Sequence, residues 1–333
     1  HAEEWMTRAV QAPAAQELSP PPPRTLPPPA AAPPPRHYLD TAGPADLRPV
    51  AAPGYAADLF AETDRYARLA LSVARGETFD VVHAHDWMTF ESGMAVAAAS
   101  GKPLVVQIHS TELDRAGSAA NPRIMEVERE GMVAADRVIA VSYRTRTQLI
   151  EKYGIDPRKI EVVYNAPGES GEAEPGEPHE PPHRRNVLFL GRLVKQKGPD
   201  YFLRAAKRIL AVEPDVRFVV AGQGEMLGEL KRLATTLGIR QHVVFTGFLP
   251  KKSAERMFRT AAVYVMPSVS EPFGIAPLEA LSQDVPVIIS RQSGVAEVLK
   301  HVLKVDFWDV EDLGNKILAV LRHPPLAQTL DRK

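Results

Sequence analysis

The sequence predicts an α/β protein made of two Rossmann-like domains that face one another across a cleft. Short apolar strands alternate with amphipathic helical segments, a pattern typical of parallel sheets covered by helices on both faces. This alternation occurs twice, and a stretch rich in proline and glutamate separates the two runs. The length of 333 residues is also enough for two domains of ordinary size.

The first 55 residues are the least regular part of the chain. They hold 14 of its 31 prolines. Such a segment favours polyproline II and cannot build a core. We therefore expect residues 1–55 to form an irregular surface segment or tail, and a ligand for a proline-binding module is the alternative.

Residues 56–165 predict the first α/β domain. Apolar, β-branched runs predict its strands at 79–85, 103–109, 137–141 and 160–165. Helical periodicity predicts helices at 88–99, 123–135 and 143–153. No strand followed by a glycine-rich loop precedes residue 79, so we expect this domain to be incomplete, with about four strands and edges that need cover.

Residues 166–185 are acidic and rich in Pro and Gly, which predicts a linker to a second domain at 186–333. The strands of the second domain are predicted at 186–191, 217–222, 242–247, 262–268 and 285–290. Its helices are predicted at 199–212, 225–237, 251–260 and 276–283. The formal charge is about +6 over 186–333 and about −3 over 56–165. This difference suits an anionic ligand in the second domain, although solvated surface charge explains it equally well.

Composition excludes several classes of protein. The chain has no cysteine, which excludes disulfides, Cys-ligated zinc, iron–sulfur clusters and a thiol nucleophile. No apolar run reaches the roughly 18 residues of a membrane span, and the net charge of −1 favours neither nucleic acid nor an anionic membrane. The expectation is a soluble, cytoplasmic protein with no metal site. The HEPPH string at 179–183 matches a zinc motif, but its two prolines disfavour the helix that such a motif needs.

Two charged patterns follow strands of the second domain. Arg192 and Lys197 lie in the loop after its first strand and just before a predicted helix. Cations at the carboxyl end of a strand and beside a helix start predict a diphosphate site, and solvated loop charges are the alternative. Glu271 and Glu279 are eight residues apart, the first in a turn and the second in the next helix. A turn carboxylate with backbone amides at a helix start can hold hydroxyls and phosphate together, and a surface capping arrangement is the alternative.

Three further features lie at predicted strand ends. Gly222 and Gly224 allow a ligand to approach the backbone near a helix start. They lack the third glycine and the following acid of a dinucleotide fingerprint, which disfavours nicotinamide binding. Asp86 and His109 follow the first two strands of the first domain, where we expect them to face the cleft. A purely structural role for these two residues is the alternative.

With these residues identified, the chain resembles the retaining glycosyltransferases of family GT4, and it is most similar to the glycogen and starch synthase-like branch. The resemblance covers about residues 60–320 and implies the GT-B fold. The motifs that carry it are HAHDW at 83–87, VQIHSTE at 106–112, GRLVKQKG at 191–198, AGQGEM at 221–226, EPFGIAPLE at 271–279 and SGVAEV at 293–298.

The resemblance also implies roles for individual residues. Arg192 and Lys197 would grip the diphosphate of the donor, Glu271 would contact hydroxyls of the transferred sugar, and Glu279 would contact the ribose. His109 would lie against the sugar ring and Asp86 near the reacting centre. The remaining residues assigned to donor binding are Gly191, Gly222, Gly224, Phe273, Gly274 and Ile275, with Phe273 and Gly274 offering backbone donors.

The resulting hypothesis is a retaining, metal-independent hexosyltransferase with no cofactor. It would take a UDP-, ADP- or GDP-sugar, with a glucosyl group as the first choice, and a carbohydrate acceptor such as an α-glucan. The alternatives are another GT4 activity with a mannosyl donor or lipid-linked acceptor, a GT-B-fold nucleotide-sugar epimerase, and a nucleotide-sugar-binding fragment without activity. An epimerase has less reason to carry both the Arg192/Lys197 and the Glu271/Glu279 pairs.

Overall fold

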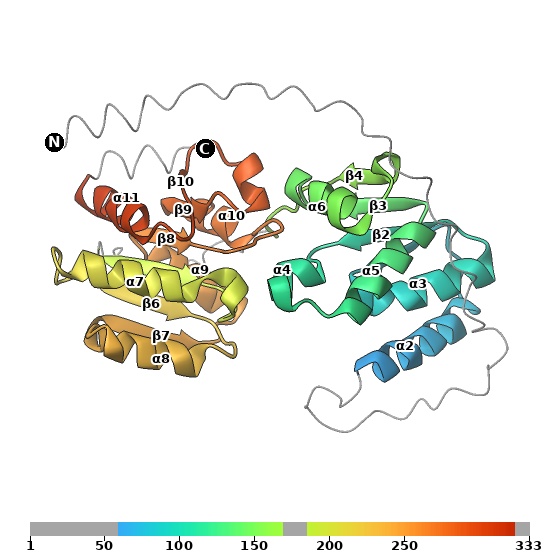
Figure 1. Ribbon diagram of the computed structural model, residues 1–333, viewed down its shortest axis with the longest axis horizontal. Coiled ribbons are helices and arrows are strands. Elements are labelled where there is room, and N and C mark those ends of the chain that lie inside the picture. Colours follow the sequence, from blue (N-terminus) through green and yellow to red (C-terminus); the bar gives the residue numbers. More distant parts are fainter. Residues whose placement is uncertain (1–58, 169–184, 324–333) are drawn as a thin grey trace, which may run out of the picture. The chain divides into compact units, whose positions relative to one another are not determined.

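The computed structural model describes residues 59–168 and 185–323. The Pro-rich segment at 1–55 lies outside these residues, as do the HEPPH string and most of the predicted linker at 166–185. The described residues form two parallel sheets, each with its own helices and core (Figure 1). The prediction of two Rossmann-like α/β units is confirmed.

The first sheet has four parallel strands in the order β1-β2-β3-β4. These strands are β1 (Val82–His85), β2 (Leu104–Ile108), β3 (Arg137–Ala140) and β4 (Ile160–Val162). All four lie inside the predicted strand segments.

Three helices of the first unit also agree with the prediction: α3 (Trp87–Ser100), α5 (Pro122–Ala134) and α6 (Tyr143–Tyr153). Two others, α2 (Leu59–Ala74) and α4 (Glu112–Ala116), were not predicted. Local sequence signals fit the observed ends. Ser142 accepts a hydrogen bond from the Thr145 amide at the start of α6, and Gly154 adopts the left-handed conformation at its end.

Apolar side chains from one face of β2 and from the neighbouring strands and helices form the first core. Val106, Phe90, Met132 and Leu149 are completely buried there. Helix α2 packs against α3 through Leu71 and Val96. This core places the carboxyl ends of β1 and β2 side by side, because β1 and β2 pair in register from Val82↔Leu104 to His85↔Gln107.

The second sheet has six parallel strands in the order β10-β9-β8-β5-β6-β7. The strands are β5 (Asn186–Leu190), β6 (Arg217–Ala221), β7 (Val243–Gly247), β8 (Val263–Met266), β9 (Val287–Ser290) and β10 (Leu303–Val305). The helices are α7 (Pro199–Leu210), α8 (Leu227–Thr236), α9 (Lys251–Arg259), α10 (Ala276–Leu281) and α11 (Val310–Arg322). Only β10 and α11 were not predicted.

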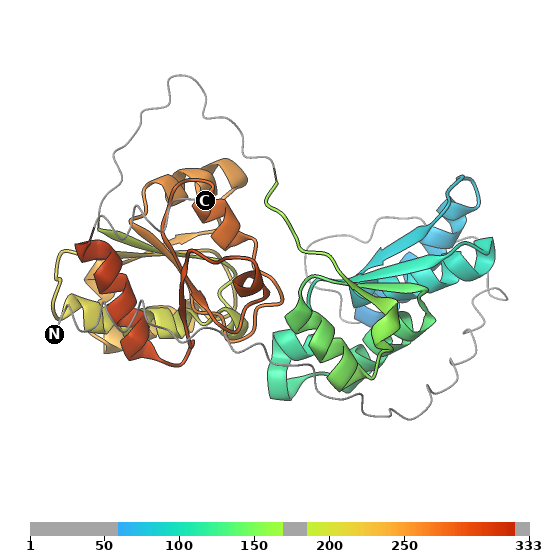
Figure 2. The same cartoon turned by 90° about the horizontal axis from the view of Figure 1, so that it is seen from above.

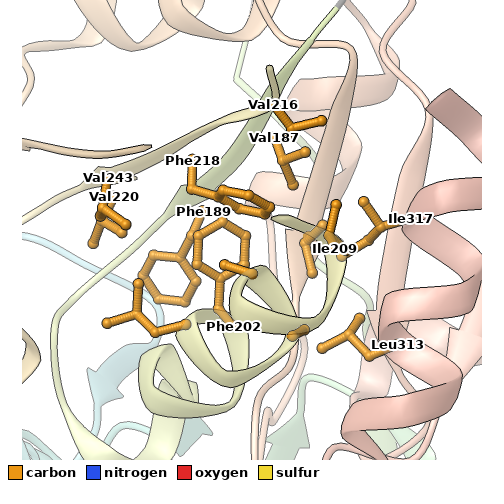
Figure 3. Close-up of a cluster of buried hydrophobic side chains, with 14 of the residues drawn as sticks. Val187, Phe189, Phe202, Ile209, Val216, Phe218, Val220, Val243, Leu313 and Ile317 are labelled. Atoms are coloured by element: carbon orange, nitrogen blue, oxygen red, sulfur yellow. The ribbon is translucent and has the colours of Figure 1, made fainter. Parts of the chain in front are cut away.

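The helices of the second unit cover both faces of the sheet. Figure 2 shows α7 and α11 on one side of the strands and α9 and α10 on the other. Phe189, Phe202 and Phe218 fill the core on the α7 side (Figure 3). Their rings meet at centroid distances of 5.8 and 5.7 Å, with Phe202 in the middle.

The order of the second sheet reverses beside its first strand. The chain runs from β5 outward through β6 to β7, and then returns to the other side of β5 with β8. In open α/β sheets, ligands bind beyond the carboxyl ends of the strands at such a switch point. The loops after β5 and β8 flank this point, and they contain Lys197 and Glu271.

Candidate functional site

Lys197 and Glu271 meet at the switch point of the second sheet. The Lys197 ammonium lies 2.5 Å from Glu271 Oε2, and the Ser268 hydroxyl donates to the same oxygen at 3.2 Å. The Glu271 side chain is 6% exposed and the Lys197 side chain 21%. The cation is therefore the partner that can meet an anionic ligand without leaving its carboxylate.

A glycine brings the loop after β5 against the loop after β8. Gly198 ends the short 3-10 turn Lys195–Lys197 and has a φ of 66°. A Cβ built on it would lie 2.1 Å from the Pro267 carbonyl oxygen. Only glycine allows this approach, which places Lys197 next to Glu271 although the two are far apart in the sequence.

Gly222 and Gly224 serve a similar purpose between the loops after β5 and β6. A Cβ at Gly222 would lie 1.9 Å from the Gly191 carbonyl oxygen, and a Cβ at Gly224 would lie 2.3 Å from the Leu193 carbonyl oxygen. The backbone of the neighbouring loop thus fills the Cβ direction of both glycines, and ligand binding beside them stays a prediction. Arg192 lies between the two residues, Gly191 and Leu193, that these glycines contact. Its side chain is exposed and has no hydrogen-bond partner within 59–168 and 185–323.

The loop after β8 is fastened to the loop after β9. Glu271 and Ser293 form a parallel bridge, and the Val295 amide donates to the Phe273 carbonyl at 2.8 Å. Phe273 is 2% exposed, and Gly274 has a φ of 97°. In the part of the chain that the structure describes, no hydrogen-bond acceptor faces the amides of Phe273, Gly274 and Ile275.

Glu279 lies in the first turn of the helix that follows these amides. Burial raises the pKa of its carboxyl, Lys251 opposes this by lowering it, and Glu255 raises it. Lys195, to which the sequence assigned no role, pairs with the buried Asp200 at 2.6 Å near the start of α7. It therefore holds the loop to its helix.

Asp86 and His109 come together at the ends of β1 and β2. Asp86 Oδ1 accepts hydrogen bonds from the backbone amides of His109 at 2.8 Å and Ser110 at 3.4 Å. Asp86 has a φ of 56°, which is rare for a residue with a side chain and indicates local backbone strain. The contact that the structure gives Asp86 is thus with the loop that carries His109.

A network around the buried Glu128 also holds this loop. Arg115 donates to the Ser110 carbonyl at 2.7 Å and to Glu128 Oε1 at 2.8 Å. Glu128 is 1% exposed and also accepts the Tyr153 hydroxyl at 2.5 Å. Burial raises the pKa of Glu128, and burial together with Glu128 raises the pKa of Tyr153.

One contact of His109 was missed by the sequence analysis. His85 Nδ1 lies 3.0 Å from His109 Nε2. The only sequence signal is the place of His85 in HAHDW, immediately before Asp86. Ser268 was missed as well, because nothing in its surroundings separates it from an ordinary loop serine.

A cavity of about 330 Å³ lies between β6, β7 and α9. Its lining includes Asn186, Arg217, Val244 and Met257, and none of the predicted site residues. Within the described ranges, no three His, Asp or Glu side chains are grouped so as to hold a metal ion. None of the described helices is long and apolar enough to cross a membrane.

Comparison with known proteins assigns a family to each half of the chain. The family described as "Glycosyltransferase Family 4" matches residues 26–167, and "Glycosyl transferases group 1" matches residues 172–333. An uncharacterized glycosyltransferase of Methanocaldococcus jannaschii is 34% identical over 250 residues, which cover 69% of this chain and 62% of that protein. D-inositol 3-phosphate glycosyltransferase 1 of Catenulispora acidiphila is 32% identical over 246 residues, covering 67% and 58%. The chain thus spans less than two thirds of the length of these two relatives.

Solved structures show the same fold. Sucrose-phosphate synthase from Thermosynechococcus elongatus superposes with a TM-score of 0.69 at 21% identity, covering 83% of this chain and 72% of that one. HepE of Anabaena, in complex with UDP and glucose, gives a TM-score of 0.68 at 18% identity, covering 80% and 74%. At these identities the similarity concerns the fold alone.

Proposed function

The chain belongs to the family 4 glycosyltransferases of the GT-B type, and we propose that it transfers a hexose from a nucleotide sugar to a carbohydrate acceptor. The observation that carries this proposal is the contact between Lys197 and Glu271 at the switch point of the second sheet. A partly exposed cation beside a buried carboxylate offers one group for a diphosphate and one for sugar hydroxyls.

The neighbouring groups suit a nucleotide diphosphate. Arg192 adds a second, exposed cation on the loop that carries Lys197, and charge-assisted contacts to phosphate are the strong ones. The amides of residues 273–275 supply neutral donors. The carboxyl of Glu279 lies one turn further on, within the same segment, and we assign it to the ribose.

Transfer with retention needs the acceptor to enter on the face from which the diphosphate leaves. In the reaction we propose, the bond between the anomeric carbon and the diphosphate oxygen breaks, and the bond to the acceptor oxygen forms on the same face. The acceptor proton passes to the leaving diphosphate oxygen. Because negative charge grows on the leaving group, Arg192 and Lys197 stabilise the transition state more than the ground state.

The two cations would take the place of a divalent metal in this scheme. Transfer should therefore continue in EDTA. Activity that disappears in EDTA and returns with Mn²⁺ or Mg²⁺ would contradict this part of the proposal.

For the donor, the UDP and glucose bound by HepE favour a UDP-glucose-like molecule. For the acceptor, two candidates stand. The resemblance to glycogen and starch synthases favours an α-glucan, and the D-inositol 3-phosphate glycosyltransferases among the relatives favour a small phosphorylated polyol.

Thermal shifts with UDP-, ADP- and GDP-sugars would identify the donor. The selected donor would then be incubated with an α-glucan or with inositol phosphate, and the products analysed by mass spectrometry. We expect stabilisation by one nucleotide series and a product one hexose heavier than its acceptor. Conversion of the donor to an isomeric sugar nucleotide would indicate an epimerase, and binding without any product would indicate a nucleotide-binding fragment.

A further inference from the structure

Three histidines form a row across the ends of β1 and β2. His83 and His85 alternate along β1, so their side chains lie on one face of the sheet, and their ring centroids are 4.2 Å apart. His109 follows the neighbouring strand β2. Its ring centroid lies 5.3 Å from that of His85, and the two ring planes differ by only 16°.

The distances show how these last two rings face each other. A five-membered ring with bonds of about 1.33 Å places each atom roughly 1.1 Å from its centroid. The 3.0 Å between His85 Nδ1 and His109 Nε2, extended by one such radius at each end, accounts for nearly all of the 5.3 Å between the centroids. The two nitrogens therefore lie close to the line between the centroids. The contact is an in-plane N–H···N hydrogen bond, and the rings lie edge to edge.

Such a contact holds one proton between two nitrogens. A neutral imidazole has one donor and one acceptor nitrogen, so one ring must present N–H and the other a lone pair. If both facing nitrogens carried protons, they would repel each other. Because Nε2 of His109 is used in this contact, Nδ1 is the ring nitrogen of His109 left for a ligand.

The surroundings favour the neutral form of His85. Partial burial of its ring lowers the pKa of His85, the nearby His83 and His109 lower it further, and Asp86 opposes them by raising it. The Asp86 carboxylate in turn holds the backbone of His109 through the 2.8 Å bond to its amide. Asp86 thus holds the backbone of His109, and the preceding residue, His85, holds its ring.

We propose that His85 is a positioning residue that fixes the ring orientation and tautomer of His109, so that His109 presents Nδ1 to the ligand. The consequence for sugar transfer rests on the proposed function, but the hydrogen bond itself does not. His85 is exposed and lies at the end of a strand, so its replacement should leave the fold intact.

The test uses the whole chain labelled with ¹⁵N-histidine. At about pH 7.5, long-range ¹H–¹⁵N spectra should show one protonated and one unprotonated nitrogen in each of His85 and His109. In His85→Leu, the nitrogens of His109 should move toward averaged, exchanging values. His85→Gln keeps an amide that can donate or accept, and it should preserve much of the wild-type pattern. His83→Gln is the matched control, and it should leave the tautomer of His109 unchanged.

Acidification gives a second readout. Because the pKa of His85 lies below the ordinary histidine value of about 6.5, acidification past that value should protonate His85 and break the contact, so the fixed tautomer pattern should disappear together for both rings. If the spectrum of His109 is the same in wild type and His85→Leu, the proposal is overturned. If the spectra change as expected but wild-type protein transfers no sugar, the positioning role stands and the proposed function fails.

In an active protein, the same variants separate positioning from folding. His85→Leu should raise the KM for the donor or lower kcat by about tenfold at an unchanged melting temperature, and His85→Gln should recover most of the loss. A full loss in both variants, or none in either, would contradict a role through His109.

Discussion

The two sheets hold their functional loops by different means. In the second sheet, the loops after β5, β6 and β8 meet backbone to backbone at Gly198, Gly222 and Gly224. In the first sheet, the loop that carries His109 is held by ionisable side chains, among them Asp86 and the Arg115–Glu128 pair. The loop contacts of the second sheet depend on the absence of side chains, and those of the first sheet depend on charged side chains. We therefore expect added side chains to damage the loops of the second sheet most. A change of pH should act mainly on the loop of the first sheet that carries His109.

The glycine contacts of the second sheet provide the largest expected effect. In Gly224→Ala, the new Cβ would lie 2.3 Å from the Leu193 carbonyl oxygen. Backbone cannot move aside as a side chain can, so we expect a loss of about 4 kcal/mol in the free energy of unfolding. Urea denaturation followed by circular dichroism measures this loss.

Gly228→Ala is the matched control, four residues further along in α8. Its new Cβ would meet only the end of the Arg232 side chain at 3.7 Å. Alanine is favoured over glycine inside a helix, so this variant should gain about 0.5–1 kcal/mol. Similar changes in the free energy of unfolding in the two variants would show that the close backbone contact at Gly224 does not stabilise the second sheet.

Substitution of Lys197 tests the proposed function of the loops after β5 and β8. Losing one charge-assisted contact to a leaving group typically costs ~3–4 kcal/mol, or about 10²–10³ in rate. Lys197→Ala should therefore lower turnover by that factor and weaken donor binding much less. Steady-state kinetics together with calorimetric donor binding distinguish the two effects.

Lys207→Ala, on the exposed face of α7, is the control for this substitution. Lys195 is unsuitable for that purpose, although it lies in the same loop, because it pairs with the buried Asp200. Equal, small effects at Lys197 and Lys207 would mean that the loop is an ordinary basic turn.

The charged network of the first sheet offers a smaller and pH-dependent effect. Tyr153→Phe removes the hydroxyl that donates to Glu128 at 2.5 Å. A hydrogen bond to a charged group contributes about 1.5–3 kcal/mol, and we expect a loss of that size at about pH 7.5. Tyr66→Phe, at a tyrosine of α2 that is 48% exposed, should change the free energy of unfolding by less than about 0.5 kcal/mol.

The sign of the pH dependence follows from the pKa of Glu128. Burial raises this pKa and the Tyr153 hydroxyl lowers it, so the pKa rises further in Tyr153→Phe. The deficit of the variant is then fully present above both pKa values, and it shrinks as the pH falls through them. A deficit that is constant or grows on acidification would show that Glu128 does not respond to its partners in this way.

Much of the fold could be predicted because strands buried on both faces leave continuous apolar runs. Every predicted strand is present, and the observed ends differ by a few residues. The strand β10 was missed because it has only three residues, two of them half-buried. The helix α4 was missed because its five residues show no period, and its one signal is the capping box of Thr111 and Asp114.

The candidate site was predictable only where a residue follows a strand. Lys197 and Glu271 follow β5 and β8, so a parallel sheet alone brings their loops to one edge. Which side chains then touch depends on loop conformation, and no pattern in the sequence reports it. For this reason the contacts of Ser268 with Glu271 and of His85 with His109 emerged only from the structure.

The central claim is that the second sheet binds the diphosphate of a nucleotide sugar through Arg192 and Lys197. Calorimetric titration of the whole chain with UDP and with uridine tests it most directly. We predict that UDP binds at least about tenfold more tightly than uridine, and that Arg192→Ala/Lys197→Ala lowers UDP binding to the level of uridine. Equal binding of UDP and uridine, or unchanged UDP binding by the double variant, would contradict the claim.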